Sequence, residues 1–287
     1  MQATPLVSVI ITSYNREDFI KEAIDSVLAS SYKNIEVIIV DDCSTDSTYE
    51  IAKEYQQKHR NIKLFRNKEN IGQFENRNKA ATYSEGKYLK FVDSDDAIFP
   101  DGIQYCVEEM EKYPEASLGL LYLNNKNLKD SKVMSSENVI RNHFFDLSIL
   151  GIGPSGTIFR KQEFDNCKGF DVRFDLAADN YLNIKMAALA PVVLLPKVFF
   201  KYRMHEGQVF NQKKMIIYSY LYNKELYLNG NLPLTKEELN YLLQKLEKRH
   251  FANMVKYLFD SKSIADVFQI IKSSKFKWWN VYRYIFY

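Results

Sequence analysis

Three carboxylates occupy four positions in residues 91–100, FVDSDDAIFP, directly after an apolar run. The negative charges of Asp93, Asp95 and Asp96 repel one another, so either a cation offsets the repulsion or the turn is fully solvated. Carboxylate oxygens at a turn suit a hard divalent cation such as Mg²⁺ or Mn²⁺. The spacing predicts a metal site at Asp93 and Asp95. The alternative is a solvated turn in which Asp96 only caps the next helix.

A second acidic pair, Asp41 and Asp42, follows the apolar run at residues 35–40. In dinucleotide-binding folds, an acid after the second strand bonds a ribose hydroxyl. The turn after the first apolar run, TSYNRE, contains no glycine, so the usual glycine-rich phosphate turn is missing. We therefore expect a nucleotide whose diphosphate needs a metal. The alternative is that both acids cap the following helix.

The sequence GIGPSG, at residues 151–156, matches the spacing of a dinucleotide fingerprint. That fingerprint requires a strand before it and a helix after it, whereas this segment precedes a predicted strand. We therefore interpret it as a flexible loop beside the substrate.

Two further candidates lie later in the chain. Asp179 falls in the first turn of a predicted helix, where an acid either complements the helix dipole or faces the cleft as a general base. His205 follows the last predicted strand, in YRMHEG, where it could be a third metal ligand or a phosphate donor. Surface capping is the alternative for His205.

The elements that must position these residues alternate along the first hundred residues. β-branched apolar runs alternate with helical patterns of about ten to fifteen residues, which predicts βαβ units and a parallel sheet. Ligands of such sheets bind beyond the carboxyl ends of the strands, and the clusters TSYN, DDCSTD and DSDD follow three of those ends. The predicted class is α/β, with a site at that edge. We expect these strands at residues 6–12, 35–40, 61–66 and 87–92.

Beyond residue 100 the pattern becomes mixed, and residues 126–149 are interpreted as a loop with a short helix. Everything after residue 208 has a helical pattern, including a capping box of Thr235 and Glu238. We predict a main domain at residues 1–208 and a helical extension at 209–287.

Composition is consistent with one large domain plus an extension, at 287 residues and 46% hydrophobic content. Cys43, Cys106 and Cys167 form no CxxC pair, so a zinc ribbon or thioredoxin-like site is not expected. No apolar run reaches the roughly 20 residues of a membrane span. The N-terminus reads as a strand and not as a signal peptide. We expect a cytoplasmic protein, and a location at the inner face of the cell membrane is compatible with the sequence.

The C-terminal segment is basic. Residues 241–287 carry nine Lys and Arg against three Asp and Glu, while the remainder carries 30 and 33. Such a tail suggests a negatively charged partner. Its end, KFKWWNVYRYIFY, mixes bases and aromatic residues as an interfacial membrane segment does. The alternative is an aromatic helix packed on the body or on a second subunit.

These motifs together resemble glycosyltransferase family 2, the inverting enzymes of the GT-A fold, and in particular bacterial polysaccharide-type sugar transferases. The resemblance implies a Rossmann-like, mostly parallel sheet flanked by helices, with a helical extension outside it. It spans roughly residues 6–205. The segments that carry it are VSVIITSYNREDFIKEAIDSVL, IEVIIVDDCSTDST, NIGQFENRNKA, GKYLKFVDSDD, ADNYLNIKMA and YRMH.

The resemblance also implies roles for individual residues. Asp93 would contact the nucleotide sugar or the surroundings of the metal, Asp95 would coordinate the metal, and Asp179 would be the catalytic base. Ala178 stands where the family commonly has Glu, so a supporting carboxylate is missing. The remaining nucleotide-binding positions would be Thr12, Tyr14, Asp42, Arg77 and Asn78.

By this resemblance the chain is a metal-dependent inverting transferase that uses Mn²⁺ or Mg²⁺. It would move a sugar from a nucleotide-diphospho-sugar, above all a UDP-sugar, to a hydroxyl of a glycan or lipid-linked acceptor in cell-surface polysaccharide synthesis. We expect peripheral membrane contact or homo-oligomers through the C-terminal helices, and no nucleic-acid partner. The alternative, favoured by Ala178, is a non-catalytic assembly subunit that acts through those helices.

Overall fold

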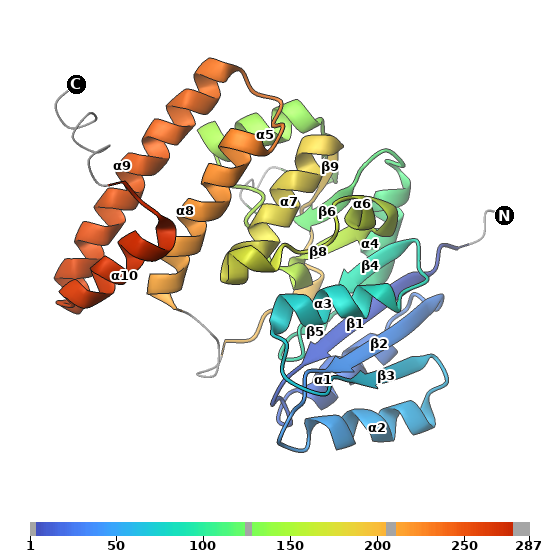
Figure 1. Cartoon of the computed structure of the whole chain (residues 1–287). Helices are drawn as coiled ribbons and strands as arrows, with labels where there is room; N and C mark the ends of the chain where they lie inside the picture. Colours follow the sequence, from blue (N-terminus) through green and yellow to red (C-terminus); the bar gives the residue numbers. More distant parts are fainter. Residues whose placement is uncertain (1–3, 124–127, 205–210, 278–287) are drawn as a thin grey trace.

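The computed structural model describes residues 4–123, 128–204 and 211–277, and within them an eight-stranded sheet forms the centre of the fold (Figure 1). The strand order is β3-β2-β1-β4-β8-β6-β9-β7. Strands β3, β2, β1 and β4 are parallel, whereas β8 is antiparallel to both β4 and β6. The strands are β1 (Val7–Ser13), β2 (Ile35–Asp41), β3 (Ile62–Arg66), β4 (Tyr88–Phe91), β6 (Leu118–Leu121), β7 (Lys132–Met134), β8 (Thr157–Arg160) and β9 (Val192–Leu195).

Helices cover both faces of this sheet because its central strands are apolar on both sides. In β1, Val9 and Ile11 join one buried cluster with α1, α2 and α4, and Ile10 joins another with α3 and α5–α7. The predicted mostly parallel sheet flanked by helices is confirmed. The helices are α1 (Ile20–Leu28), α2 (Thr48–Lys58), α3 (Gln73–Thr82), α4 (Gly102–Glu111), α5 (Ser136–Phe145), α6 (Lys161–Asn166) and α7 (Ala178–Leu189).

The middle of the chain is more regular than the sequence indicates. Within residues 128–149, β7 and the ten-residue helix α5 form, since α5 buries Val139 and Ile140 against the sheet. Strand β9 ends at Leu195, directly before Pro196, and β10 (Phe200–Lys201) pairs separately with β5 (Ala97–Ile98). This small second sheet places the chain near residue 200 beside the acidic turn.

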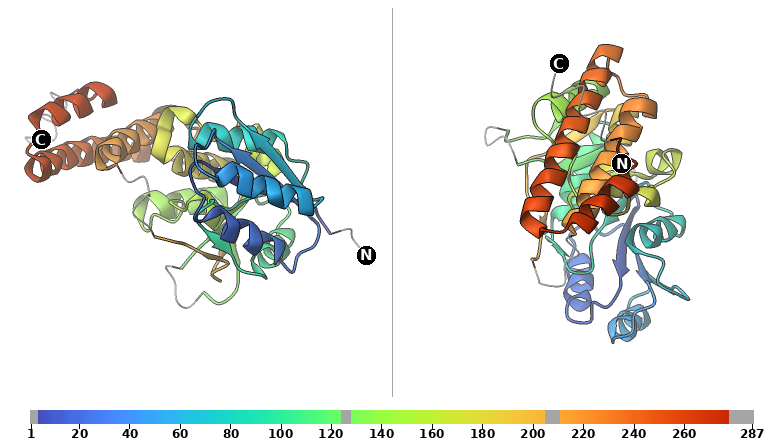
Figure 2. Two further views of the ribbon diagram at one scale, coloured as in Figure 1. Left: turned by 90° about the horizontal axis from the view of Figure 1, so that it is seen from below. Right: turned by 60° about the vertical axis from the view of Figure 1, so that its left-hand side comes forward.

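The helical extension projects to one side of the sheet (Figures 1 and 2). It comprises α8 (Gln212–Asn229), α9 (Lys236–Ser261) and α10 (Ile264–Ser274), and the capping box of Thr235 and Glu238 is confirmed. Tyr220 and Leu226 of α8 belong to the same buried cluster as α7, so the extension continues the core of the main domain. The boundary near residue 208 remains a prediction.

None of the helices formed by the described residues combines the length and the apolarity that crossing a bilayer requires. The aromatic end of the tail, residues 278–287, lies outside the described residues, as does His205.

Candidate active site

A cleft of about 760 Å³ lies where β1, β2 and β4 end. Residues far apart in the sequence meet there because parallel strands present their carboxyl ends at one edge of the sheet. Seven of the nine predicted site residues line this cleft, namely Thr12, Tyr14, Asp42, Arg77, Asp93, Asp95 and Asp179.

Hydrogen bonds join the turns that follow β1 and β2. The Asn15 backbone amide donates to Ser44 Oγ at 3.0 Å, and the Thr45 amide donates back to Asn15 Oδ1 at 2.9 Å. The Arg16 amide donates to Thr48 Oγ1 at 2.7 Å. Asn15 adopts φ 50°, a left-handed conformation that asparagine tolerates better than most residues. The floor of the cleft is thereby rigid.

Asp42 fixes the loop that leads into α3. Its Oδ1 accepts hydrogen bonds from Asn67 Nδ2 at 2.7 Å and from the Ile71 amide at 3.0 Å, and its Oδ2 accepts one from the Gly72 amide at 2.9 Å. A carboxylate offers about four acceptor positions, so one remains for a ligand hydroxyl. The alternative role as a cap for the next helix is wrong, because Ser47 is the N-cap residue of α2.

Two arginines offset the repulsion within the acidic turn. Arg77 Nη2 lies 2.5 Å from Asp93 Oδ1, and Arg16 Nε lies 3.3 Å from Asp95 Oδ2. Asp96 is buried, and burial together with Asp93 raises its pKa to about 6. Its Oδ1 accepts a hydrogen bond from the Arg203 amide at 3.1 Å. Asp96 therefore anchors the segment after β10 and does not cap α4, whose N-cap residue is Asp101.

Lys90, a residue that the sequence analysis missed, lies fully buried in β4 beneath the acidic turn. Its Nζ donates to the carbonyl oxygens of Phe91 at 2.8 Å and Ser155 at 2.5 Å. Ser155 Oγ in turn accepts a hydrogen bond from the Asp93 amide at 2.9 Å. Burial lowers the pKa of Lys90 to about 8. The available signal was a lysine inside the otherwise apolar run YLKFV.

The loop at residues 151–156 precedes β8, as expected, and forms the 3-10 turn η1 (Pro154–Gly156). Gly153 and Pro154 line the cleft. All three residues of η1 are buried, so this part of the predicted flexible loop is packed into the protein. A Cβ atom at Gly153 would lie 3.9 Å from Asp179 Oδ2, which places the loop beside the predicted base.

Asp179 is half-buried in the first turn of α7. Burial raises its pKa to about 6, although the Asn180 amide, 2.7 Å from Oδ1, and the Arg77 charge act in the opposite direction. A carboxylate with this pKa is ionised at neutral pH yet basic enough to take a proton. Ala178 is fully buried in the core, so the missing side chain at this position lies away from the cleft.

Asp175 is a further carboxylate of the cleft that the sequence did not single out. It lies in the 3-10 turn η2 (Val172–Ala177), where its φ of 42° departs from the surrounding helical geometry. Its Oδ2 lies 2.7 Å from the ammonium of Lys214. Lys214 and Met215 also line the cleft, so α8 of the extension contributes to the site.

Asn78 does not line the cleft. Its Nδ2 donates to the Phe170 carbonyl at 2.7 Å, and its Oδ1 accepts from the Phe170 amide at 2.8 Å. The side chain therefore fastens the segment before η2 to α3, and its position gives no support to the predicted nucleotide contact.

The residues present fit a hard divalent cation in type. No group of three or more His, Cys, Asp or Glu side chains arranged for a metal occurs among the described residues. Asp93 and Asp95 nevertheless offer the one or two carboxylates with which Mg²⁺ is held alongside substrate phosphates. Within the described part of the chain, Ser13 Oγ and Arg77 Nε are buried without a hydrogen-bond partner. Both residues line the cleft, which suits a polar ligand.

Comparison with known proteins decides the family. Residues 8–167 match the model of glycosyl transferase family 2. The chain belongs to this family. Ala178, the residue that favoured a non-catalytic subunit, is buried in the core and does not line the cleft.

Two of the similar proteins come from bacteria. GlyA of Streptococcus pneumoniae is 30% identical over 219 residues, which is 71% of this chain and 31% of that protein. TuaG of Bacillus subtilis, a putative teichuronic acid biosynthesis glycosyltransferase, is 43% identical over 106 residues, or 37% of this chain and 42% of that protein. The matches thus span less than half of these two relatives.

Solved structures share the fold of this chain. TarS residues 1–349 from S. aureus, in complex with UDP-GlcNAc, superpose with a TM-score of 0.72 at 24% identity, covering 93% of this chain and 79% of that one. The mannosyltransferase PcManGT from Pyrobaculum calidifontis, in complex with GDP-Man and Mn²⁺, gives 0.67 at 16% identity, covering 96% and 80%. The predicted GT-A fold is confirmed.

Proposed function

We propose that this glycosyltransferase moves a sugar from a UDP-sugar to a hydroxyl of a glycan or lipid-linked acceptor, with inversion at the anomeric carbon and with Mn²⁺ or Mg²⁺ bound. The observation that carries the proposal is the convergence of Asp42, Asp93, Asp95 and Asp179 on one cleft at the carboxyl edge of the sheet.

The donor nucleotide is assigned to the side of the cleft formed by β1, β2 and α3. Asp42 retains an acceptor position for a ribose hydroxyl, and Tyr14 exposes 43% of its surface at the cleft, where its ring can contact a base. The UDP complexes of TarS, a protein of the same fold, support a uridine donor.

A divalent cation would be held by Asp95 with Asp93 beside it, and by His205 as the predicted third ligand. When bound, it supplies positive charge that stabilises the diphosphate as a leaving group. The chain adds cations of its own, because Arg16, Arg77 and Lys214 all line the cleft. Arg16 has to release Asp95 for that carboxylate to serve as a ligand.

Asp179 acts as the general base. It accepts the proton of the acceptor hydroxyl while the acceptor oxygen forms a bond to the anomeric carbon, and the bond from that carbon to the diphosphate oxygen breaks. A single displacement of this kind inverts the anomeric configuration. The half-buried position of Asp179 keeps its proton affinity high enough for the transfer.

The acceptor is assigned to cell-surface polysaccharide. Names among the similar proteins point that way, including teichuronic acid biosynthesis for TuaG and chondroitin synthase in Escherichia coli and Pasteurella multocida. We place the reaction in the cytoplasm at the inner face of the membrane, where lipid-linked acceptors are available.

Replacing Asp179 by Asn tests the assignment. We expect UDP release from a panel of UDP-sugars and GDP-mannose to fall by about a thousandfold or more with the best donor, because the base is lost. Calorimetric binding of UDP with Mn²⁺ should stay within about threefold of wild type, since Asp179 is not assigned to the nucleotide.

Asp18→Asn, at an exposed position outside the cleft, is the matched control and should change neither quantity. A D179N enzyme that turns over at the wild-type rate contradicts the role of Asp179. Absence of UDP binding in the wild-type chain contradicts the donor assignment.

A further inference from the structure

A second hollow of about 800 Å³ lies on the other side of α3 from the cleft. Its walls are the outer side of α3, the segment after α6 and the middle of α7. The charged side chains that line it are Glu75, Lys79, Lys168, Asp171, Arg173 and Lys185, and we call this hollow the basic groove.

The positive charges of the basic groove are only partly neutralised. Arg173 pairs with Asp171 at 2.6 Å. Lys79 Nζ donates instead to Asn67 Oδ1 at 2.8 Å, and Lys185 Nζ donates to the Cys167 carbonyl at 2.9 Å, so both use uncharged partners. Within residues 4–123, 128–204 and 211–277, no carboxylate lies within 4 Å of the ammonium groups of Lys79, Lys168 or Lys185. The lining carries four cationic side chains against the carboxylates of Glu75 and Asp171, so cations are in excess. A concave surface with an excess of one sign of charge concentrates ligands of the opposite sign.

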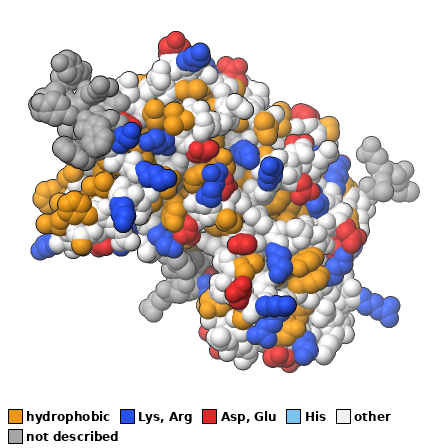
Figure 3. Space-filling view, viewed as in Figure 1, with side chains coloured by type: hydrophobic (Ala, Val, Ile, Leu, Met, Phe, Trp, Pro, Cys, Tyr) orange, Lys and Arg blue, Asp and Glu red, His pale blue; other side chains and the backbone are white. Residues whose placement is uncertain are grey.

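The groove is built on rigid supports. Asn78 clamps the Phe170 backbone to α3 through both ends of its amide. Gly169, at φ +65°, approaches this amide so closely that a Cβ atom there would lie 2.4 Å from Asn78 Oδ1. On the face shown in Figure 3, which is viewed as in Figure 1, Lys and Arg side chains are interspersed with Asp and Glu side chains. The backbone that carries Lys168 and Arg173 is therefore held to α3 by the contacts of Asn78.

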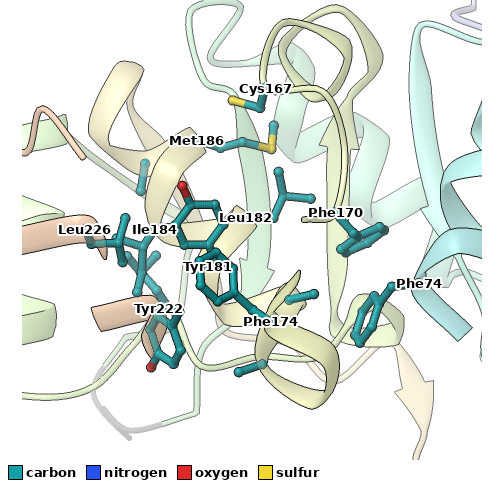
Figure 4. Packing of buried hydrophobic residues seen from close by; sticks show 14 of the residues in the cluster. Phe74, Cys167, Phe170, Phe174, Tyr181, Leu182, Ile184, Met186, Tyr222 and Leu226 are labelled. Atoms are coloured by element: carbon teal, nitrogen blue, oxygen red, sulfur yellow. The ribbon is translucent and has the colours of Figure 1, made fainter. Parts of the chain in front are cut away.

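The same two elements wall the groove and the cleft. Arg77 of α3 lines the cleft, whereas Lys79 lines the groove; Asp179 of α7 lines the cleft, whereas Lys185 lines the groove. Between the two hollows, the Phe74 and Phe170 rings pack with centroids 5.1 Å apart, and those of Phe174 and Tyr181 lie 4.5 Å apart (Figure 4). Phe74 lines the cleft and Phe170 lines the groove, so these packed rings form part of the wall between the two hollows.

We propose that the basic groove binds an anionic stretch of the acceptor glycan, one that carries carboxylate or phosphodiester groups, and so directs the acceptor toward Asp179. The inference rests on the proposed function. The donor diphosphate is already assigned to the cleft, which leaves the groove to the acceptor. Its aromatic lining residues, Phe170 and Tyr181, are buried, so it lacks the exposed rings on which single-stranded nucleic acids stack.

Fluorescence anisotropy with the full chain tests the proposal. The probes are a labelled hyaluronan octasaccharide for carboxylates, a short poly(glycerol phosphate) for phosphodiesters, and a neutral dextran oligomer of equal length. We expect at least one anionic probe to bind, with affinity that falls as salt rises, and the dextran to show no binding. The two anionic arms identify which acid the groove prefers.

Lys168→Glu is the main variant. Lys168 is exposed, its ammonium makes no hydrogen bond or ion pair within the described residues, and the substitution changes the charge of the groove by two units. It should weaken anionic-probe binding about tenfold at low salt. Lys58→Glu makes the same charge change on exposed α2 and should stay within about twofold of wild type. Lys185→Gln, which keeps a donor for the Cys167 carbonyl, serves as the second variant and should also weaken binding.

UDP binding with Mn²⁺ is measured on every variant, so the two proposals can fail separately. Intact UDP binding together with no anionic-probe binding overturns the groove assignment and leaves the donor assignment standing. Equal weakening by Lys58→Glu and Lys168→Glu also overturns it, because net charge alone then explains the effect. Loss of UDP binding in wild type overturns the proposed function itself.

Discussion

The two sides of the cleft treat their carboxylates differently. On the side of β1, β2 and β4, Asp42 accepts three hydrogen bonds, and Asp93 and Asp95 each face an arginine. On the side of α7, the Asp179 carboxylate accepts a hydrogen bond from the neighbouring Asn180 amide, and burial raises its pKa. Paired acids suit binding, and a desolvated acid suits proton transfer, so environment assigns two roles to one residue type.

The largest expected loss on the binding side comes from removing the acids of the turn together. In Asp93→Asn/Asp95→Asn we expect Mn²⁺-dependent UDP affinity to fall by at least about a hundredfold, because the proposed ligand Asp95 and the carboxylate beside it both lose their charge. Calorimetry with and without Mn²⁺ measures the change. If the metal increases UDP affinity in the variant as much as in wild type, Asp93 and Asp95 do not have the metal-binding role proposed for this side of the cleft.

Lys90→Met should have the next largest effect, by removing the buried cation that links the acidic turn to the loop beside Asp179. We expect UDP affinity to fall about tenfold, since Ser155, which accepts the hydrogen bond of the Asp93 amide, loses its own hydrogen bond from Lys90. Lys90 is a positioning residue in this account, so kcat and KM are measured separately along with thermal unfolding. Unchanged KM and UDP affinity in a folded Lys90→Met variant would show that the acidic turn keeps its position without the Lys90 ammonium.

The pH profile sharpens the comparison from the catalytic side. Because the pKa of Asp179 is about 6, kcat at saturating donor should fall about tenfold per pH unit below that value, as the base becomes protonated. The pKa of Asp96 is raised to the same value, so Asp96→Asn is the discriminating control. The Asp96→Asn enzyme should still lose activity below about pH 6, and we call this fall of kcat the acidic limb of the pH profile. Disappearance of the limb in Asp96→Asn would reassign it to the acidic turn.

The smallest effect is on stability. Burial favours protonated Asp179, so its contribution is full below the unfolded pKa near 4 and is lost as pH rises through about 6. Asp179→Asn should therefore be more stable than wild type at pH 7.5, by about 1–3 kcal/mol. Urea unfolding at pH 4 and 7.5 measures this difference. A variant that gains nothing at pH 7.5 relative to pH 4 contradicts a desolvated carboxylate.

The sequence predicts the side of the cleft nearest the strands well, because parallel strands deliver their end residues to one place. Prediction fails where the direction of a side chain decides its role. Neighbouring residues on a helix point about 100° apart. Arg77 faces the cleft, while Asn78 faces Phe170. Asp179 faces the cleft, and Ala178 faces the core for the same reason.

The other site residues could not be predicted because their roles depend on contacts between segments far apart in the sequence. Lys90 has no motif around it, and its importance comes from Ser155, which is 65 positions away. Asp175 and Lys214 meet across 39 positions, between a 3-10 turn and a helix that the sequence assigns to a separate extension. Periodicity reports which residues are buried but not which distant segment they meet.

The Asp175–Lys214 pair has a consequence for how such enzymes are divided and recombined. A module cut at the edge of the family resemblance, near residue 205, would leave behind α8 and with it part of the catalytic wall. It would also expose apolar residues of α7, because Tyr220 and Leu226 of α8 belong to the same buried cluster as that helix. The smallest transferable unit therefore runs past α8. A chimera that exchanges α8 to α10 therefore also exchanges Lys214 and Met215, which line the cleft.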